Sequence, residues 1–163
     1  ATPTRLLDWS ENAMVALAFA TQFHNDSHTG HDAIVWCLNP ILLNSHIRFP
    51  EYDSEPIPNI CDNNELQTMF ESPRQDYPVA IIGPQNTDRI IAQRGLFTLF
   101  PNKDSFTMES LSSAEKFLVK IVIPESDIKP ISEALYYIGI TESTLFPELD
   151  SISKELKRNY MAR

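Results

Sequence analysis

Glycine is scarce in this chain, with only four in 163 residues. None of them forms a glycine-rich turn between a strand and a helix, so the sequence has neither a phosphate-binding P-loop nor a dinucleotide-binding fingerprint. A Gly-x-Ser-x-Gly motif, a His-Glu-x-x-His motif and internal repeats are also absent. These absences exclude the familiar hydrolases and kinases.

Cysteine and long apolar runs are scarce as well. Cys37 lies in an apolar stretch and Cys61 in a polar one, without the spacing of a metal or redox site. Nothing at the N-terminus has the pattern of a signal peptide, and we expect a cytoplasmic protein. The most apolar stretch, 13–20, is well short of the ~20 residues that cross a bilayer, so we expect no membrane span.

The charge is strongly negative. Twenty-two acidic residues against thirteen basic ones give a net charge of −9. Such a chain repels the phosphates of nucleic acids and the surface of anionic lipids, which disfavours general nucleic-acid binding. A local basic pocket around Arg5, or around Arg89 and Arg94, remains compatible with this charge, because net charge does not describe a cleft.

Apolar patterns predict an α+β fold with a mixed β-sheet and a buried central helix. Four apolar runs are typical of strands: 33–38, 79–82, 96–100 and 117–123. The run 33–38 predicts a strand that is buried on both faces. The central helix is expected over 11–23, with Ser10 as its N-cap. Every residue of 13–20 is apolar, so we expect this helix to be buried on all sides.

The remaining segments predict a single domain over 1–163 with a long irregular insertion at about 40–78. The insertion has one short helical pattern near Leu66. A helical turn is expected from Asn86 or Thr87 through Gln93, with Gly95 in the left-handed conformation at its end. We also expect a helix from about Pro130 to Gly139 and a last helix over 147–160.

Arg5 and Asp8 stand beside the apolar helix, and two interpretations remain open. In the first, they form a structural ion pair and Asp8 supports the start of the helix. In the second, Arg5 and the free N–H groups of the first helical turn bind a phosphate-bearing ligand. Both interpretations predict that the two side chains are largely buried, because the segment has little access to water.

Three of the four histidines lie close together, at His24, His28 and His31, with Asp26 and Asp32 between and beside them. These side chains are donors that zinc or nickel can use. A metal site also needs ligands held at fixed geometry, which a polar loop does not provide. We therefore expect no structural metal here.

Three blocks of sequence resemble the FRG domain family. Thr4-Arg-Leu-Leu-Asp-Trp-Ser10, followed by Ala16-Leu-Ala-Phe-Ala20, is similar to its signature, and Arg89-Ile-Ile-Ala-Gln-Arg-Gly-Leu-Phe-Thr98 is similar to its second block. A third block includes Gly139-Ile140 and Ser143-Thr-Leu-Phe-Pro147. The aromatic-Arg-Gly motif that names the family is absent from this chain. The resemblance therefore implies the C-terminal portion of such a domain.

By analogy of fold, the order of these blocks implies an enzyme similar to the ADP-ribosyltransferases, with NAD as its substrate. Gln93 and Arg5 would then be the catalytic residues. The NAD site would be formed by Arg5, Asp8, Trp9, Arg89 and Phe97. The alternative is a non-catalytic ligand-sensing or protein-interaction module in a bacterial defence or toxin-like system. The missing motif and the lack of an evident acid/base pair favour this alternative, so the enzyme assignment stays open.

Overall fold

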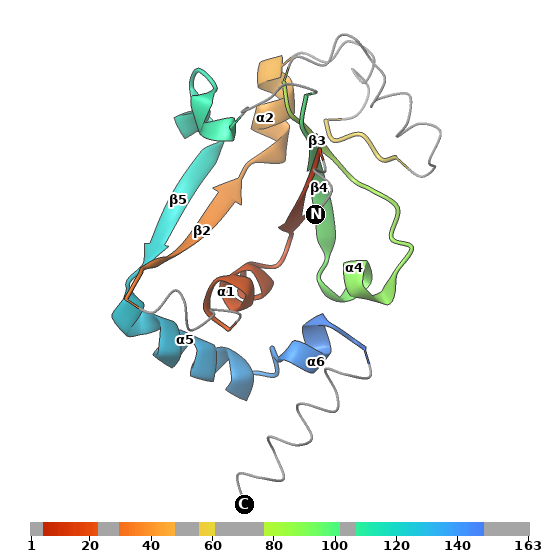
Figure 1. Cartoon of the computed structure of the whole chain (residues 1–163). Coiled ribbons are helices and arrows are strands. Elements are labelled where there is room, and N and C mark those ends of the chain that lie inside the picture. Colours follow the sequence, from red (N-terminus) through yellow and green to blue (C-terminus); the bar gives the residue numbers. More distant parts are fainter. Residues whose placement is uncertain (1–4, 23–29, 48–55, 61–76, 102–106, 149–163) are drawn as a thin grey trace, which may run out of the picture. The chain divides into compact units, whose positions relative to one another are not determined.

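A computed structural model describes residues 5–22, 30–47, 56–60, 77–101 and 107–148 (Figure 1). Helices and strands both occur in this part of the chain, which confirms the α+β class. The chain divides into two compact units. Unit 1 consists of Ala1–Trp9, Trp36–Pro84 and Leu96–Lys120, and unit 2 consists of Ser10–Val35, Gln85–Gly95 and Ile121–Arg163. The expectation of a single domain stays a prediction.

The described elements follow one another in a mixed order. The strands are β1 (Leu6–Ser10), β2 (Ala33–Leu38), β3 (Val79–Ile81), β4 (Gly95–Leu99) and β5 (Leu118–Ile123). The α-helices are α1 (Ala13–Thr21), α2 (Pro40–Ile47), α4 (Asp88–Ala92), α5 (Glu125–Tyr137) and α6 (Glu142–Leu145). Two short 3₁₀ helices, η3 (Met108–Ser110) and η4 (Ala114–Lys116), precede β5.

The four expected strands form, but they belong to two sheets rather than to one mixed sheet. One sheet has the order β1-β4-β3, and the other consists of β2 and β5. In the first, Val79 of β3 lies opposite Leu99 of β4 in an antiparallel pair. The expectation of one sheet was wrong because an apolar strand pattern specifies a buried face and does not specify which strand pairs with it.

Both faces of the three-stranded sheet carry apolar clusters within unit 1. Alternation along the strands divides the side chains between the faces. One cluster contains Ile60, Val79, Ile81 and Leu99, with Leu6 and Phe97 against it. The other contains Leu43, Ala80, Met108, Leu111, Phe117 and Leu118, with Trp9 and Phe100 among its partly buried neighbours. The sheet therefore forms the core of unit 1.

A side chain of α2 covers the outer edge of β3. The Asn44 carboxamide donates to the Ala80 carbonyl oxygen at 2.9 Å, and its Oδ1 accepts from the Ala80 N–H at 2.9 Å. Its Nδ2 also donates to the carbonyl oxygen of Pro56 at 2.9 Å. A carboxamide has the same donor and acceptor as a peptide group, so Asn44 takes the place of a further strand and blocks that edge.

Helix α2 itself was not expected, because 40–78 was predicted to be irregular apart from one short helix near Leu66. Asn39 caps it, with its Oδ1 accepting from the N–H of Leu42 at 3.0 Å. Pro40 occupies the first helical position, where a missing N–H carries no cost. The Asn-Pro pair was therefore a signal for this helix.

Replacing Asn44 tests this edge protection. Asn44→Asp keeps the shape of the side chain but removes the Nδ2 donor, which leaves two backbone carbonyls without their bond. We expect the free energy of unfolding to fall by about 1–3 kcal/mol. Urea unfolding of the variant measures the change, and Asn39→Asp, which retains its capping oxygen, is the control. Equal stability of wild type and Asn44→Asp would contradict the role of the carboxamide.

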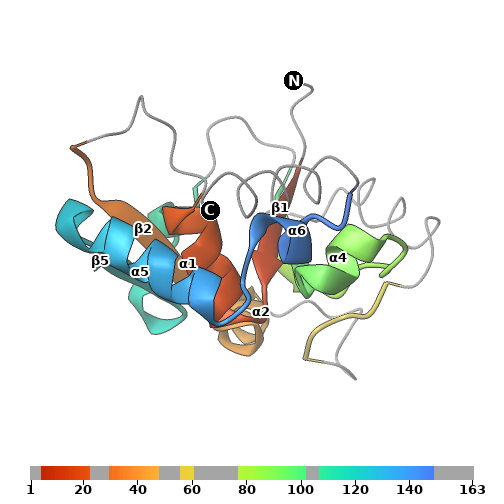
Figure 2. The same cartoon turned by 90° about the horizontal axis from the view of Figure 1, so that it is seen from below.

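Helices α1 and α5 pack against each other in unit 2 (Figure 2). Val15 and Ala18 of α1 form a cluster with Leu135 of α5 and Leu145 of α6. The expectation that α1 is buried on all sides was wrong, since Met14 is 42% and Phe19 is 41% exposed. An apolar composition alone does not place partners around a helix. Leu17 and Ala20 of α1 meet a second cluster, which contains Ile123 and Ile128, while Met14 and Phe19 stay partly exposed.

Helix α5 begins at Glu125, five residues before the expected start at Pro130, which the helix accommodates in its interior. The N–H of Glu125 has no partner within the helix and donates to Oδ1 of Asp32 at 3.1 Å. Gly139, with φ of +85°, follows the helix as expected. Asp32 is thus a helix cap supplied by a segment far away in the sequence.

The strands of the second sheet are less buried than expected. In β2, Ala33 is buried but Ile34 and Cys37 are exposed, which corrects the expectation of a strand buried on both faces. In β5, Val119 is 56% exposed although it lies in one of the apolar runs. Each strand has one hydrogen-bonded neighbour in this sheet.

The expected helix near Leu66 lies outside the described residues. The expected helix over 147–160 runs beyond them.

The cap on α5 provides a second test. Asp32→Ala leaves the N–H of Glu125 without its acceptor, and we expect a loss of about 0.5–2 kcal/mol in the free energy of unfolding. Asp32→Asn keeps a capping oxygen and should restore most of it. Thermal unfolding followed by circular dichroism measures both variants. An Asp32→Ala protein as stable as wild type would contradict the capping role.

Candidate functional site

The residues predicted for the site fall in both units. Arg5, Asp8, Trp9 and Phe97 belong to unit 1. Arg89 and Gln93 belong to unit 2. The implied catalytic site with both Arg5 and Gln93 therefore stays a prediction, and each group is described within its own unit.

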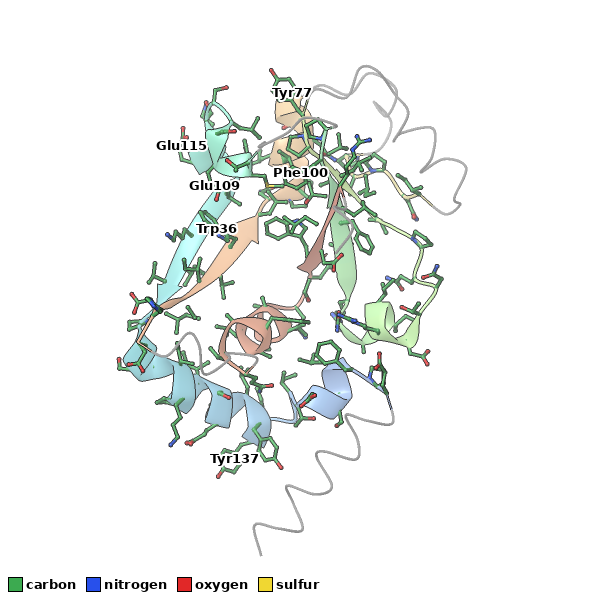
Figure 3. The ribbon with its side chains drawn as sticks, in the orientation of Figure 1. Trp36, Tyr77, Phe100, Glu109, Glu115 and Tyr137 are labelled. Atoms are coloured by element: carbon green, nitrogen blue, oxygen red, sulfur yellow. The ribbon has the colours of Figure 1, made fainter. Side chains whose placement is uncertain are left out.

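Arg5 directly precedes β1 and binds the residue that follows β4. Its Nε donates to the carbonyl oxygen of Phe100 at 2.8 Å, and the N–H of Phe100 donates to the carbonyl oxygen of Arg5 at 2.7 Å. Phe100 is labelled in Figure 3. Partial burial lowers the pKa of the Arg5 guanidinium, which still stays protonated at neutral pH. Arg5 therefore joins the start of β1 to the end of β4.

Asp8 does not take the role expected of it. Its side chain is exposed, whereas the sequence predicted burial. Residues three apart along a strand project to opposite faces, so the ion pair between Arg5 and Asp8 is also disfavoured. The N-cap of α1 is Asn12, whose Oδ1 accepts from the N–H of Met14 at 3.0 Å. Ser10, the expected cap, ends β1 instead.

Trp9 and Phe97 are parts of the core of unit 1. The Phe97 ring lies against Gly83, where an added Cβ would stand 2.7 Å from the ring atom Cδ2. Trp9 packs on the cluster that contains Ala80. Its Nε1 is buried and makes no hydrogen bond within the described part of the chain. Both aromatic rings are thus used in packing, which explains them without a ligand.

Gln93 joins three segments of unit 2. Its Nε2 donates to the carbonyl oxygen of Leu145 at 3.0 Å, and its own carbonyl oxygen accepts from Oγ of Ser10 at 2.7 Å. The three segments come from the three blocks that resemble the FRG family. Folding therefore brings parts of these blocks together in unit 2.

Arg89 lies one helical turn before Gln93 on the same face of α4. Its guanidinium carbon is 4.8 Å from the centroid of the Phe146 ring, the geometry of a cation–π contact. Phe19 meets the same ring edge to face, with centroids 5.7 Å apart. Arg89 is nevertheless exposed, so its N–H groups are accessible while the guanidinium plane is supported by the ring.

The short helix α4 ends differently from the expectation. Thr87 caps it, as one of the two predicted alternatives, with its Oγ1 accepting from the N–H of Ile90 at 3.2 Å. The left-handed residue is Arg94, with φ of +47°, whereas the sequence predicted Gly95. Gly95 begins β4, and a Cβ there would stand 3.2 Å from Cγ2 of Ile90. Packing explains this glycine and backbone conformation does not.

Metal binding and membrane insertion have no support among the described residues. Within them, no group of three or more His, Cys, Asp or Glu side chains could hold a metal ion. His24 and His28 lie outside this part of the chain, and Asp32 caps α5. No helix in the described ranges is long and apolar enough to cross a membrane.

Comparisons of the chain with models of known protein families, with curated proteins and with solved structures found no match. The fold defines the chain as an α+β protein. The resemblance to the FRG domain family stays a prediction. Phe146 is the residue of the candidate site that the sequence did not single out, although it lay within the third block.

The two polar residues at the start of the chain can be separated by substitution. Asn12→Ala removes the cap of α1 and should lower the free energy of unfolding by about 0.5–2 kcal/mol. Asp8→Ala changes an exposed side chain and should stay within about 0.5 kcal/mol of wild type. Chemical denaturation of both variants measures the difference. A severely destabilised Asp8→Ala protein would restore the buried-pair interpretation.

Proposed function

We propose that this chain is a non-catalytic, FRG-like ligand-sensing module, and that unit 2 binds the phosphate groups of a nucleotide-like small molecule at Arg89. The observation that carries the proposal is the setting of this arginine. Its guanidinium is exposed and is held over the Phe146 ring at 4.8 Å. A planar guanidinium held in one orientation can donate two parallel hydrogen bonds to a phosphate.

The setting of the two expected catalytic residues supports a role without catalysis. Arg5 donates through Nε to the Phe100 carbonyl oxygen, and Gln93 donates through Nε2 to that of Leu145. Both contacts hold distant segments of the chain together within their own units. A side chain that makes such contacts stabilises the fold, and its removal should lower the free energy of unfolding first.

A second candidate is an ADP-ribosyltransferase-like enzyme that acts on NAD. One feature of Gln93 favours it. Only the Nε2 atom of the carboxamide has a hydrogen bond among the described residues, so Oε1 remains available to orient a ribose hydroxyl. In that case Arg89 would bind the diphosphate of NAD. The two candidates share the anion contact and differ in whether nicotinamide is released.

Calorimetric titration with NAD and with ADP tests the binding. Both ligands should bind wild type, and Arg89→Ala should weaken the binding at least about tenfold, because a charge-assisted hydrogen bond contributes about 1.5–3 kcal/mol. Arg89→Lys keeps the charge and loses the planar fork, so its affinity should lie between the two. Lys129→Ala removes another exposed cation of unit 2 and is the matched control.

Labelled NAD distinguishes the two candidates. Under the first proposal, incubation releases no more nicotinamide than buffer does and transfers no label to protein. Release above buffer that Gln93→Ala abolishes, in a variant that remains folded, would replace the first proposal with the second. The absence of binding to either ligand would overturn both.

A further inference from the structure

Arg94 occupies a backbone position that favours glycine. It follows Gln93, the C-cap of α4, and has φ of +47°, which places it in the left-handed region. Glycine adopts this conformation without steric cost and is the usual residue there, whereas other side chains bring Cβ too close to the neighbouring carbonyl oxygen. The chain nevertheless carries an arginine at 94 and a glycine at the next position.

The backbone of Arg94 is fixed on both sides. Its N–H donates to the carbonyl oxygen of Ile91 at 3.1 Å, and its carbonyl oxygen accepts from the N–H of Glu11 at 3.2 Å. The left-handed conformation is therefore part of the junction between α4 and the segment that leads into α1. Any residue at this position has to adopt it.

Within the described part of the chain, the side chain of Arg94 makes no polar contact that stabilises the fold, so stability does not explain why an arginine occupies this position. It is exposed, and it makes no hydrogen bond or ion pair with the described residues. A cation near the end of a helix is favourable, but a lysine or an arginine at a right-handed position of the same turn would give that effect without strain. Strained residues of this kind cluster at functional sites.

We infer that Arg94 is a second anion-binding residue of unit 2, which acts with Arg89 on a ligand that carries a diphosphate. The inference rests on the proposed function. Two guanidiniums are close in sequence, on α4 and directly after its C-cap, and both are exposed. Two cations match the charge of a diphosphate better than that of a single phosphate. Arg94 then determines specificity for ligands with two linked phosphates.

One substitution separates this role from a structural one. Arg94→Gly relieves the backbone strain and should raise Tm by about 2–4 °C, the shift expected for about 1 kcal/mol in a chain of this size. The same variant should bind ADP at least about tenfold more weakly than wild type, since it loses one charge-assisted contact. A gain in stability together with a loss of affinity is not expected of a surface residue without a ligand.

A ligand with a single phosphate and two further variants of Arg94 extend this test. AMP carries one phosphate, and Arg94→Gly should change its affinity less than about threefold. Arg94→Lys keeps the charge and should retain more ADP affinity than Arg94→Asn, a neutral residue that tolerates the left-handed region. If wild type binds neither ADP nor NAD, the proposed function fails and this inference fails with it. If Arg89→Ala weakens ADP binding and Arg94→Gly does not, the inference alone fails.

Discussion

The carboxamide of Asn44 and the peptide group of Ala80 make the interaction on which the arrangement of unit 1 most depends. Donor meets acceptor on both sides at 2.9 Å, and the same amide reaches Pro56. A buried or edge peptide group without a partner is costly, so a sheet of three strands needs its edges covered. By covering β3, Asn44 also fixes α2 beside it, and the apolar clusters then form on the two faces.

The same physical requirement recurs throughout the chain. Asp32 accepts from the first N–H of α5, Asn12 accepts from that of Met14, and Gln93 donates to the carbonyl oxygen of Leu145. These polar side chains satisfy backbone groups at helix starts or at a junction between segments. Asp32 and Gln93, which were candidate site residues in the sequence, have this structural role. Polar identity alone therefore does not distinguish a ligand residue from a backbone partner.

Accessibility makes that distinction within unit 2. Gln93 is half-buried and engaged, whereas Arg89 is exposed and oriented by the Phe146 ring. Arg94 is exposed on a backbone conformation that disfavours it. A cation–π contact costs the arginine none of its N–H donors, because the ring contacts the face of the guanidinium and the donors lie in its plane. The Phe146 ring therefore orients the Arg89 guanidinium while its N–H groups stay accessible to a ligand.

The sequence by itself determined the α+β class, the positions of four strands, a helical cap at either Asn86 or Thr87, and the stop at Gly139. These features follow from local alternation, capping chemistry and the conformational freedom of glycine, all of which act over a few residues. Only the tertiary structure decided that the strands form two sheets, that Asp8 is exposed, and that Asn44 and Asp32 serve distant backbone groups. Those outcomes depend on which segments meet, and hydrogen bonds between residues 36 or 93 positions apart leave no pattern in a local stretch of sequence.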